Sequence, residues 1–263
     1  MTQSIEGFTS FIHADATGRS HPVYRRGSGP PIIIIHELLG ISPMLVDFAE
    51  RVVERGFSVY LPALIPRRRG PLGPLLSTIQ VCISAEFVTL ARGKTSPIVD
   101  WLRSLGETLH TRSEGRVGVV GMCLTGGFAL AMAVDDHIAG PVMAHPALPF
   151  GIGSRRRSDL GLSPQHLIAL QGRADLRILG VRFSSDLVAP APRFARMESE
   201  FGERFTRTEL PSGCRSPLGL PPWEHSVLAS RRLRSTKPKD AAARAELERV
   251  VDEVLDFLKT ELA

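Results

Sequence analysis

The segment from Arg116 to Ala133 (RVGVVGMCLTGGFALAMA) constrains the fold of this chain more than any other stretch. It begins with a valine-rich run whose length and β-branched content favour a buried strand, and it ends in an alanine-rich apolar run that favours a buried helix. Glycines crowd the junction between the two, which indicates a turn too sharp for ordinary side chains. Cys123 lies at the apex of this predicted turn.

A cysteine at such a junction is typical of the nucleophile turn of α/β-hydrolases, which raises the reactive atom above the sheet. The N–H of the next residue then serves as an oxyanion donor. The helix that follows points its N-terminus at Cys123, which should lower the pKa of the thiol and favour thiolate. The alternative is a small core residue, the commonest role of a lone cysteine, so the choice depends on finding catalytic partners.

The length of the chain favours a single domain, and its cysteine content favours thiols that are not paired in disulfides. A chain of 263 residues with 43% hydrophobic residues can bury one large core, so we predict a single domain over residues 1–263. Cys82, Cys123 and Cys214 have no paired spacing, which indicates neither a disulfide framework nor a zinc site. No signal-peptide pattern and no membrane-spanning apolar run is present. We therefore expect a soluble cytoplasmic protein with no membrane partner.

The formal net charge of +5 raises nucleic acid as a partner. Much of the excess lies in arginine clusters at residues 67–69, 155–157 and 231–234. No aromatic residues alternate with these arginines and no nucleic-acid-binding motif accompanies them, which favours solvated loops. We therefore predict a small-molecule substrate and no nucleic-acid partner, and an anionic substrate would fit the charge.

Strand and helix patterns alternate along the chain. The predicted strands are Phe8–His13, Pro22–Arg25, Ile32–Ile35, Phe57–Leu61, Ile138–Met143, Gln165–Leu170 and Arg204–Glu209. The predicted helices are Met44–Arg55, Ser96–Thr111 with Ser96 as N-cap, Arg193–Glu200, Asp240–Glu261 and a weakly patterned segment up to about Leu90. A loop rich in proline and arginine at 62–74 follows a strand. This order predicts an α/β fold with a doubly wound, mostly parallel sheet and helices on both faces.

Partners for Cys123 should lie beyond the carboxyl ends of the strands, in the chain order nucleophile, acid, histidine. Asp175 follows the predicted strand 165–170 and is the candidate acid, with a simple turn cap as the alternative. His225 precedes the last helix and is the candidate base. His36 and His145, both at strand ends, compete with it for that role.

These motifs resemble those of the dienelactone hydrolase family of α/β-hydrolases over nearly the whole chain. The motifs that carry the resemblance are His36–Gly40, Gly121–Cys123 with the glycines that follow, Gly172–Asp175, and His225-Ser226. The resemblance implies an α/β-hydrolase fold with Cys123 as nucleophile, His225 as base and Asp175 as the acid that orients it.

The resemblance also assigns residues around the nucleophile. It implies that the backbone N–H groups of Leu38 and Leu124 form the oxyanion hole. It implies that Glu37 contacts the thiol of Cys123 and helps to control its ionisation. The alternative for Glu37 is a structural one, in which its carboxylate accepts hydrogen bonds from backbone N–H groups of its own loop.

Several positions depart from the family pattern. Thr125 stands where the simplest pattern has glycine, and Glu224 rather than glycine precedes the histidine. The family position for an arginine that binds a substrate carboxylate is Ala229 here. Arg231 and Arg232 lie close by but out of register, so they are weak candidates for substrate binding.

The sequence therefore predicts a cysteine-dependent hydrolase of small carboxylic esters or lactones, of the carboxymethylenebutenolidase type. It would act through a Cys-His-Asp triad and a thioester intermediate, with no metal and no organic cofactor. One alternative is a broader carboxylesterase or thioesterase, and another is a catalytically silent α/β-hydrolase that serves as a binding protein. We expect a monomer or a homodimer.

Overall fold

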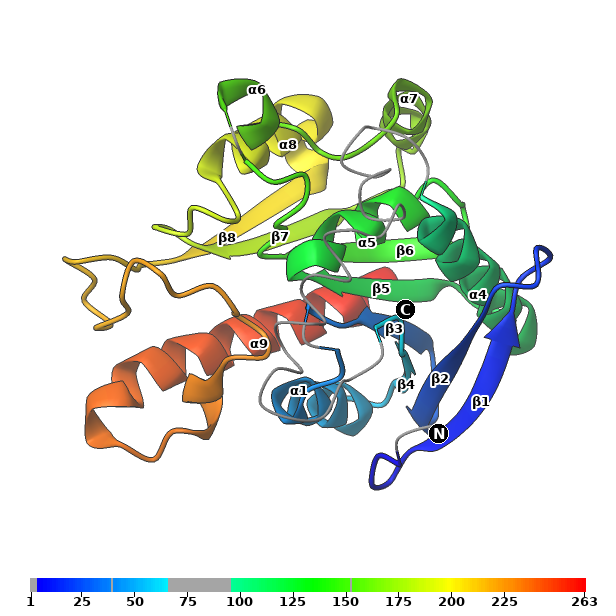
Figure 1. Ribbon diagram of the computed structural model, residues 1–263, viewed down its shortest axis with the longest axis horizontal. Helices are drawn as coiled ribbons and strands as arrows, with labels where there is room; N and C mark the ends of the chain where they lie inside the picture. Colours follow the sequence, from blue (N-terminus) through cyan, green and yellow to red (C-terminus); the bar gives the residue numbers. More distant parts are fainter. Residues whose placement is uncertain (1–3, 39, 66–95, 152) are drawn as a thin grey trace.

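The computed structural model describes residues 4–38, 40–65, 96–151 and 153–263, in which one eight-stranded sheet forms the centre (Figure 1). The strand order is β1-β2-β4-β3-β5-β6-β7-β8. β1 (Thr9–Ala14), β2 (Ser20–Gly27) and β4 (Ser58–Pro62) pair antiparallel. All remaining pairs are parallel, and they involve β3 (Pro31–Ile35), β5 (Val117–Met122), β6 (Ile138–Ala144), β7 (Ile178–Phe183) and β8 (Phe205–Leu210).

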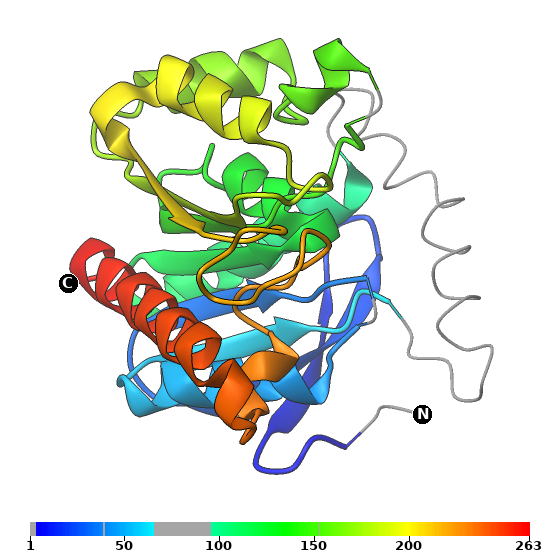
Figure 2. The ribbon, with the colours of Figure 1, turned by 90° about the vertical axis from the view of Figure 1, so that its left-hand side faces the viewer.

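Helices cover both faces of the sheet (Figure 2). One face carries α1 (Pro43–Glu54) and α9 (Ala241–Glu261). The other carries α4 (Pro97–Ser113), α5 (Gly126–Met132) and α8 (Ala191–Phe201). Two further helices, α6 (Ser154–Arg157) and α7 (Pro164–Gly172), lie in the connection between β6 and β7. The predicted doubly wound, mostly parallel sheet of an α/β-hydrolase is confirmed.

The isoleucine run of β3 shows how the sequence produces these two layers. Side chains alternate between the faces of a strand, and here both faces are covered, so every position must be apolar. Ile32 and Ile34 pack into the core beneath α1 and α9, whereas Ile33 and Ile35 pack into the core beneath α4 and α5. All four side chains are fully buried.

Three helices begin with the same serine-proline pair. Ser42 caps α1, Ser96 caps α4 and Ser163 caps α7, each accepting a hydrogen bond from a backbone N–H in the first turn. The proline that follows has no N–H to leave unsatisfied and a φ angle suited to a helix. The prediction of Ser96 as an N-cap is confirmed.

One predicted strand is wrong. The segment Gln165–Leu170 belongs to helix α7, which starts at the Ser163 cap and buries only Leu170. Its neighbour Ile168 is 68% exposed. A four-residue apolar run does not distinguish a strand from a helix, and here the serine-proline start decides for the helix. The strand of this region is β7, further along the chain.

Some predicted features fall on residues that the structure does not describe. These are the segment up to about Leu90, most of the loop at 62–74, and Cys82. Within the described ranges, no helix combines the length and the apolar character needed to cross a membrane.

Candidate active site

Cys123 follows β5 directly and opens a single turn of 3-10 helix, Cys123–Thr125, that leads into α5. Its φ angle is +56°, a left-handed conformation that is unfavourable for any residue with a side chain. A Cβ at Gly121 would lie 2.3 Å from the Thr125 carbonyl oxygen, and one at Gly126 would lie 2.7 Å from the Cα of Pro146. These two glycines therefore make the turn possible. Gly127 has no neighbour within 3.7 Å of such a Cβ, so the turn does not require it.

Thr125 anchors the nucleophile turn to the neighbouring strand. Its hydroxyl accepts the N–H of Met122 at 3.0 Å and lies 3.0 Å from the carbonyl oxygen of Ile35, a possible acceptor for its one proton. The carbonyl oxygens of Met122 and His36 lie at 2.9 and 3.2 Å. The side chain is buried. A threonine in place of glycine is therefore accommodated, because its hydroxyl joins the ends of β3 and β5.

His225 forms its main hydrogen bond with Asp186. Nδ1 of His225 lies 2.6 Å from Oδ2 of Asp186, which is buried. The other carboxylate oxygen accepts the N–H groups of Val188 at 2.8 Å and Ala189 at 3.1 Å. Asp186 lies three residues after the end of β7, where this kind of sheet places catalytic groups. It is the residue that orients His225.

The prediction of Asp175 as the acid is therefore wrong. Asp175 precedes β7, whereas Asp186 follows it, so the two carboxylates lie at opposite ends of the same strand. Asp175 is exposed and forms salt bridges with Arg116 at 2.5 Å and Arg173 at 2.9 Å. The error follows from the strand that was misplaced at 165–170.

The charge state of His225 is set by its surroundings. Burial lowers its pKa, but the interactions with Asp186 and Cys123 outweigh burial and raise the pKa to about 10. Burial also raises the pKa of Asp186, but the hydrogen bond and charge of His225 and the N–H groups of Ala189 and Val188 together outweigh burial and lower the carboxyl pKa. Within the described residues, the buried Nε2 of His225 has no hydrogen bond of ordinary geometry. This nitrogen is left to exchange a proton with the thiol, and such contacts are often loose before substrate binds.

The two competing histidines have both ring nitrogens engaged. His36 Nδ1 donates to the carbonyl oxygen of Glu37 at 2.7 Å, and its Nε2 accepts the N–H of Leu64 at 3.0 Å. His145 Nε2 lies 2.8 Å from Oε1 of Glu37, and its Nδ1 accepts the N–H of Val227 at 3.4 Å. Both rings are fully buried, and burial lowers the pKa of each. Neither histidine has a free nitrogen for a substrate.

Glu37 forms its hydrogen bonds with His145 and Ser226, and its predicted contact with the thiol stays a prediction. Its Oε1 accepts the hydroxyl of Ser226 at 2.7 Å and the ring N–H of His145, and among the described residues its side chain makes no hydrogen bond to Cys123. Burial raises the pKa of Glu37, but the hydrogen bond from His145 and the other partners outweigh burial and lower it. Glu37 is therefore an ionised carboxylate between the loop after β3 and the loop of His225.

The two predicted oxyanion donors lie at one edge of the sheet. Leu38 comes shortly after β3, and Leu124 comes directly after Cys123. β3 and β5 are adjacent and parallel, with Ile35 paired to Gly121. The side chains of Leu38 and Cys123 pack against the same hydrophobic core. The two residues therefore follow the carboxyl ends of adjacent strands, and their role as oxyanion donors stays a prediction.

The two arginines proposed for substrate binding differ in their contacts. Arg232 donates to Glu224 at 3.0 Å and to Asp240 at 2.7 Å, so its guanidinium group holds the loop of His225. Arg231 is exposed, at the start of the 3-10 turn Arg231–Arg234. In the described ranges, no group of three or more His, Cys, Asp or Glu side chains is arranged to hold a metal ion.

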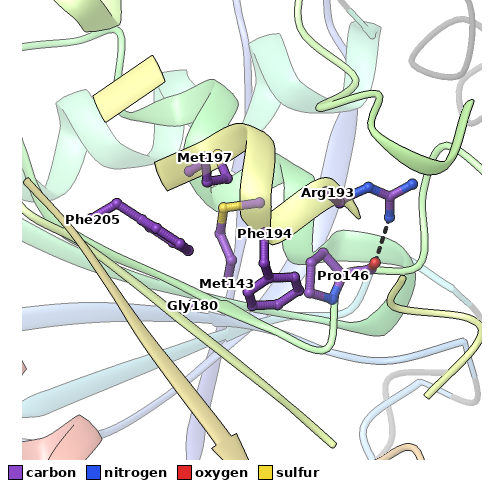
Figure 3. Close-up of a pocket in the computed structure, with 7 residues that line it drawn as sticks. All are labelled: Met143, Pro146, Gly180, Arg193, Phe194, Met197 and Phe205. Atoms are coloured by element: carbon purple, nitrogen blue, oxygen red, sulfur yellow. Dashed lines mark hydrogen bonds between the residues drawn. The ribbon is translucent and has the colours of Figure 1, made fainter. Parts of the chain in front are cut away.

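Figure 3 shows an apolar void beneath α8 that belongs to the packing of the fold and has no room for a water molecule. Arg193 lies at its rim and donates to the carbonyl oxygen of Pro146 at 2.5 Å. The same guanidinium also binds the carbonyl oxygens of Pro149 and Asp159. Pro146 is the residue that packs against Gly126, so Arg193 supports the back of the nucleophile turn.

Comparison with known proteins shows the family to which this chain belongs. The model of the dienelactone hydrolase family matches residues 20–210, and no curated protein matches the chain. Among solved structures, dienelactone hydrolase from Anabaena variabilis is similar at 14% identity and a TM-score of 0.63, over 98% of this chain and 100% of that one. A dienelactone hydrolase-like promiscuous phosphotriesterase from metagenomic libraries is similar at 13% identity and a TM-score of 0.60, over 97% and 99%.

An alpha-beta serine hydrolase homologue from Coxiella burnetii is similar at 12% identity and a TM-score of 0.57, over 97% of this chain and 99% of that one. Identities this low support the fold alone, and the family model carries the assignment. The match over 20–210 includes the nucleophile turn, the strand-end glutamate and the newly identified Asp186. The chain belongs to the dienelactone hydrolase family of α/β-hydrolases.

Proposed function

We propose that this protein is a cysteine-dependent hydrolase of small carboxylic esters or lactones. Cys123 is the nucleophile, His225 the base and Asp186 the residue that orients the base. The observation that carries the proposal is the 2.6 Å bond between His225 and Asp186, which leaves the opposite ring nitrogen to the neighbouring cysteine. A nucleophile, a base and an orienting acid in this order are sufficient for acyl transfer.

Hydrolysis would proceed in two halves. The raised pKa of His225, about 10, favours a state in which Nε2 of His225 already holds the thiol proton of Cys123, and the thiolate sulfur attacks the carbonyl carbon of the substrate. The N–H groups of Leu38 and Leu124 hold the oxyanion, a contribution of roughly 3 kcal/mol for each donor. The tetrahedral intermediate collapses, His225 gives its proton to the leaving alkoxide, and a thioester remains. Water then loses a proton to His225 and attacks the thioester, which releases the acid and restores the thiol.

The loop that carries His225 favours substrates that present no carboxylate group to it. Arg232 is already neutralised by Glu224 and Asp240, and the position of the family's carboxylate-binding arginine is the buried Ala229. A substrate carboxylate bound there would have to displace one of two existing salt bridges. We therefore expect uncharged esters or lactones to be hydrolysed faster than the corresponding half-acids.

The test is hydrolysis of p-nitrophenyl acetate, followed by mass spectrometry of acid-quenched samples. The wild-type protein should turn over the ester and carry one acetyl group on Cys123, since thioesters survive acid. Cys123→Ala should lose both signals, whereas Cys214→Ala, at an exposed free cysteine, should keep them. Turnover that survives Cys123→Ala would contradict the proposal. An absence of turnover and of acylation across esters, thioesters and lactones would favour a binding protein.

A further inference from the structure

A second histidine lies against the proposed catalytic one and takes no part in the mechanism above. His145 follows β6 and is fully buried, with a φ angle of +41°. Its ring meets that of His225 edge-on, with centroids 4.7 Å apart. This residue needs an explanation, because a positive φ angle at a non-glycine residue and the burial of a polar side chain both oppose folding.

The partners of His145 determine which nitrogen carries its proton. The backbone N–H of Val227 can only donate, so Nδ1 of His145 is the acceptor. Nε2 therefore carries the hydrogen and donates it to Oε1 of Glu37. Burial lowers the pKa of His145, and the nearby charge of His225 lowers it further, although the bond to Glu37 opposes this. The ring is neutral and acts as a fixed donor.

Through these bonds, His145 connects the two loops that frame the thiol. Oε1 of Glu37 accepts two hydrogen bonds, one from the ring N–H of His145 and one from the hydroxyl group of Ser226. Ser226 and Val227 directly follow His225. The carboxylate is thereby turned toward the histidine loop and makes no hydrogen bond to Cys123 among the described residues.

We infer that His145 is a positioning residue for His225, which it serves by holding the ionised Glu37 against the histidine loop. The inference rests on the proposed function. In the part of the chain that the structure describes, the charged or titratable groups that interact with His145 and His225 are Glu37, Asp186 and Cys123. Glu37 therefore stabilises the imidazolium of His225 through space, and His225 is the acceptor of the thiol proton among the described residues.

The test is a double-mutant cycle with His145→Phe and Glu37→Gln, read both as kcat/KM and as the rate of Cys123 alkylation by iodoacetamide against pH. His145→Phe removes the donor to Glu37, so protonation of Glu37 becomes easier and its pKa rises. We expect kcat/KM to fall at least about tenfold and its acid-side midpoint to move to higher pH. In the Glu37→Gln background, His145→Phe should have little further effect, because the group through which it acts is already gone.

Matched variants keep the test informative if His145→Phe fails to fold. His145→Gln retains an amide that can donate to Glu37, whereas the shorter His145→Asn does not reach it. The first should stay within about threefold of the wild type and the second should resemble His145→Phe. His166→Phe, in α7, is the control for a histidine-to-phenylalanine change elsewhere.

Three results would overturn the inference: multiplicative effects of the two substitutions, equal behaviour of the Gln and Asn variants, or a lower melting temperature with an unchanged pH profile. A wild-type protein that neither hydrolyses esters nor reacts at Cys123 would instead reject the proposed function. The two failures are therefore distinguishable.

Discussion

Asp186 and His225 lie 2.6 Å apart although 39 residues separate them in the chain. The bond joins the loop after β7 to the loop before α9. It decides which of two aspartates, Asp175 before β7 or Asp186 after it, completes the proposed triad. It also turns the other nitrogen of His225 toward the nucleophile turn, so the geometry of the whole site depends on it.

Asp186→Asn should therefore abolish most of the activity. An amide in place of the carboxylate no longer holds the imidazole in the correct tautomer, and kcat should fall by roughly three to four orders of magnitude. Asp175→Asn is the matched control, because its exposed carboxylate lies at the other end of β7 and pairs there with Arg116 and Arg173, away from His225. Steady-state kinetics and melting temperatures of both variants check this. Equal losses in the two variants would reject the assignment of Asp186.

The pKa of His225 should fall when either negative neighbour is removed. It is raised to about 10 because Asp186 and Cys123 outweigh burial. Cys123→Ala removes one of these partners, so the imidazolium should lose its proton at a lower pH than in the wild type. NMR titration of histidine-labelled protein measures the shift. His110, stacked on His137 elsewhere in the fold, is an internal reference within the same spectra. An unchanged titration of His225 in this variant would mean that the thiol does not act on the ring.

The three glycines of the nucleophile turn should differ in their tolerance of alanine. A Cβ at Gly121 or Gly126 would overlap backbone atoms, so each substitution should cost roughly 1 to 3 kcal/mol or more in unfolding free energy. Gly127→Ala has room and lies within α5, where alanine is favoured by roughly 0.5 to 1 kcal/mol. Urea denaturation of the three variants tests the order. A Gly127→Ala variant as unstable as the others would contradict it.

The hydroxyl of Thr125 should matter more than its methyl group. Thr125→Val keeps the shape but leaves the Met122 N–H and the Ile35 carbonyl without their partner, at a cost of roughly 1 to 3 kcal/mol. Turnover should fall as well, because the variant loosens the turn that carries Cys123. Thr125→Ser retains the hydroxyl and should stay close to the wild type in both measurements. The idea fails if Thr125→Ser is the more damaged of the two.

The parts of the fold that the sequence predicted correctly have strong local signals. The Ile32–Ile35 run specifies a strand covered on both faces, and the serine-proline pairs mark where helices begin. β7 was missed because it contains Arg182, which is buried and paired with Glu209. A charged residue in a central strand hides the strand from a hydrophobicity pattern. The acid was missed with it, although the sequence ILGVRFSSD does end in an aspartate shortly after a mostly apolar segment.

The site residues divide in the same way. Cys123 and His225 could be selected as candidates from the sequence because a glycine-rich junction and the chain order point to them. The partner of Glu37 could not, since the bond to His145 joins residues 108 positions apart and depends on how β3 and β6 are arranged. A resemblance located the carboxylate but not the direction in which it points. Only the packed structure shows that Glu37 faces the histidine loop.

The proposed triad draws its members from the ends of β5 and β7 and from the segment after β8, three places that meet only when the sheet is complete. During synthesis, Cys123 therefore leaves the ribosome long before the base that activates it. The thiol of a nascent or truncated chain has no imidazole beside it, so its reactivity reports on whether the last strand and the closing helix have docked. The rate of Cys123 alkylation can accordingly be used to follow the final step of folding, in which His225 comes to lie beside the thiol.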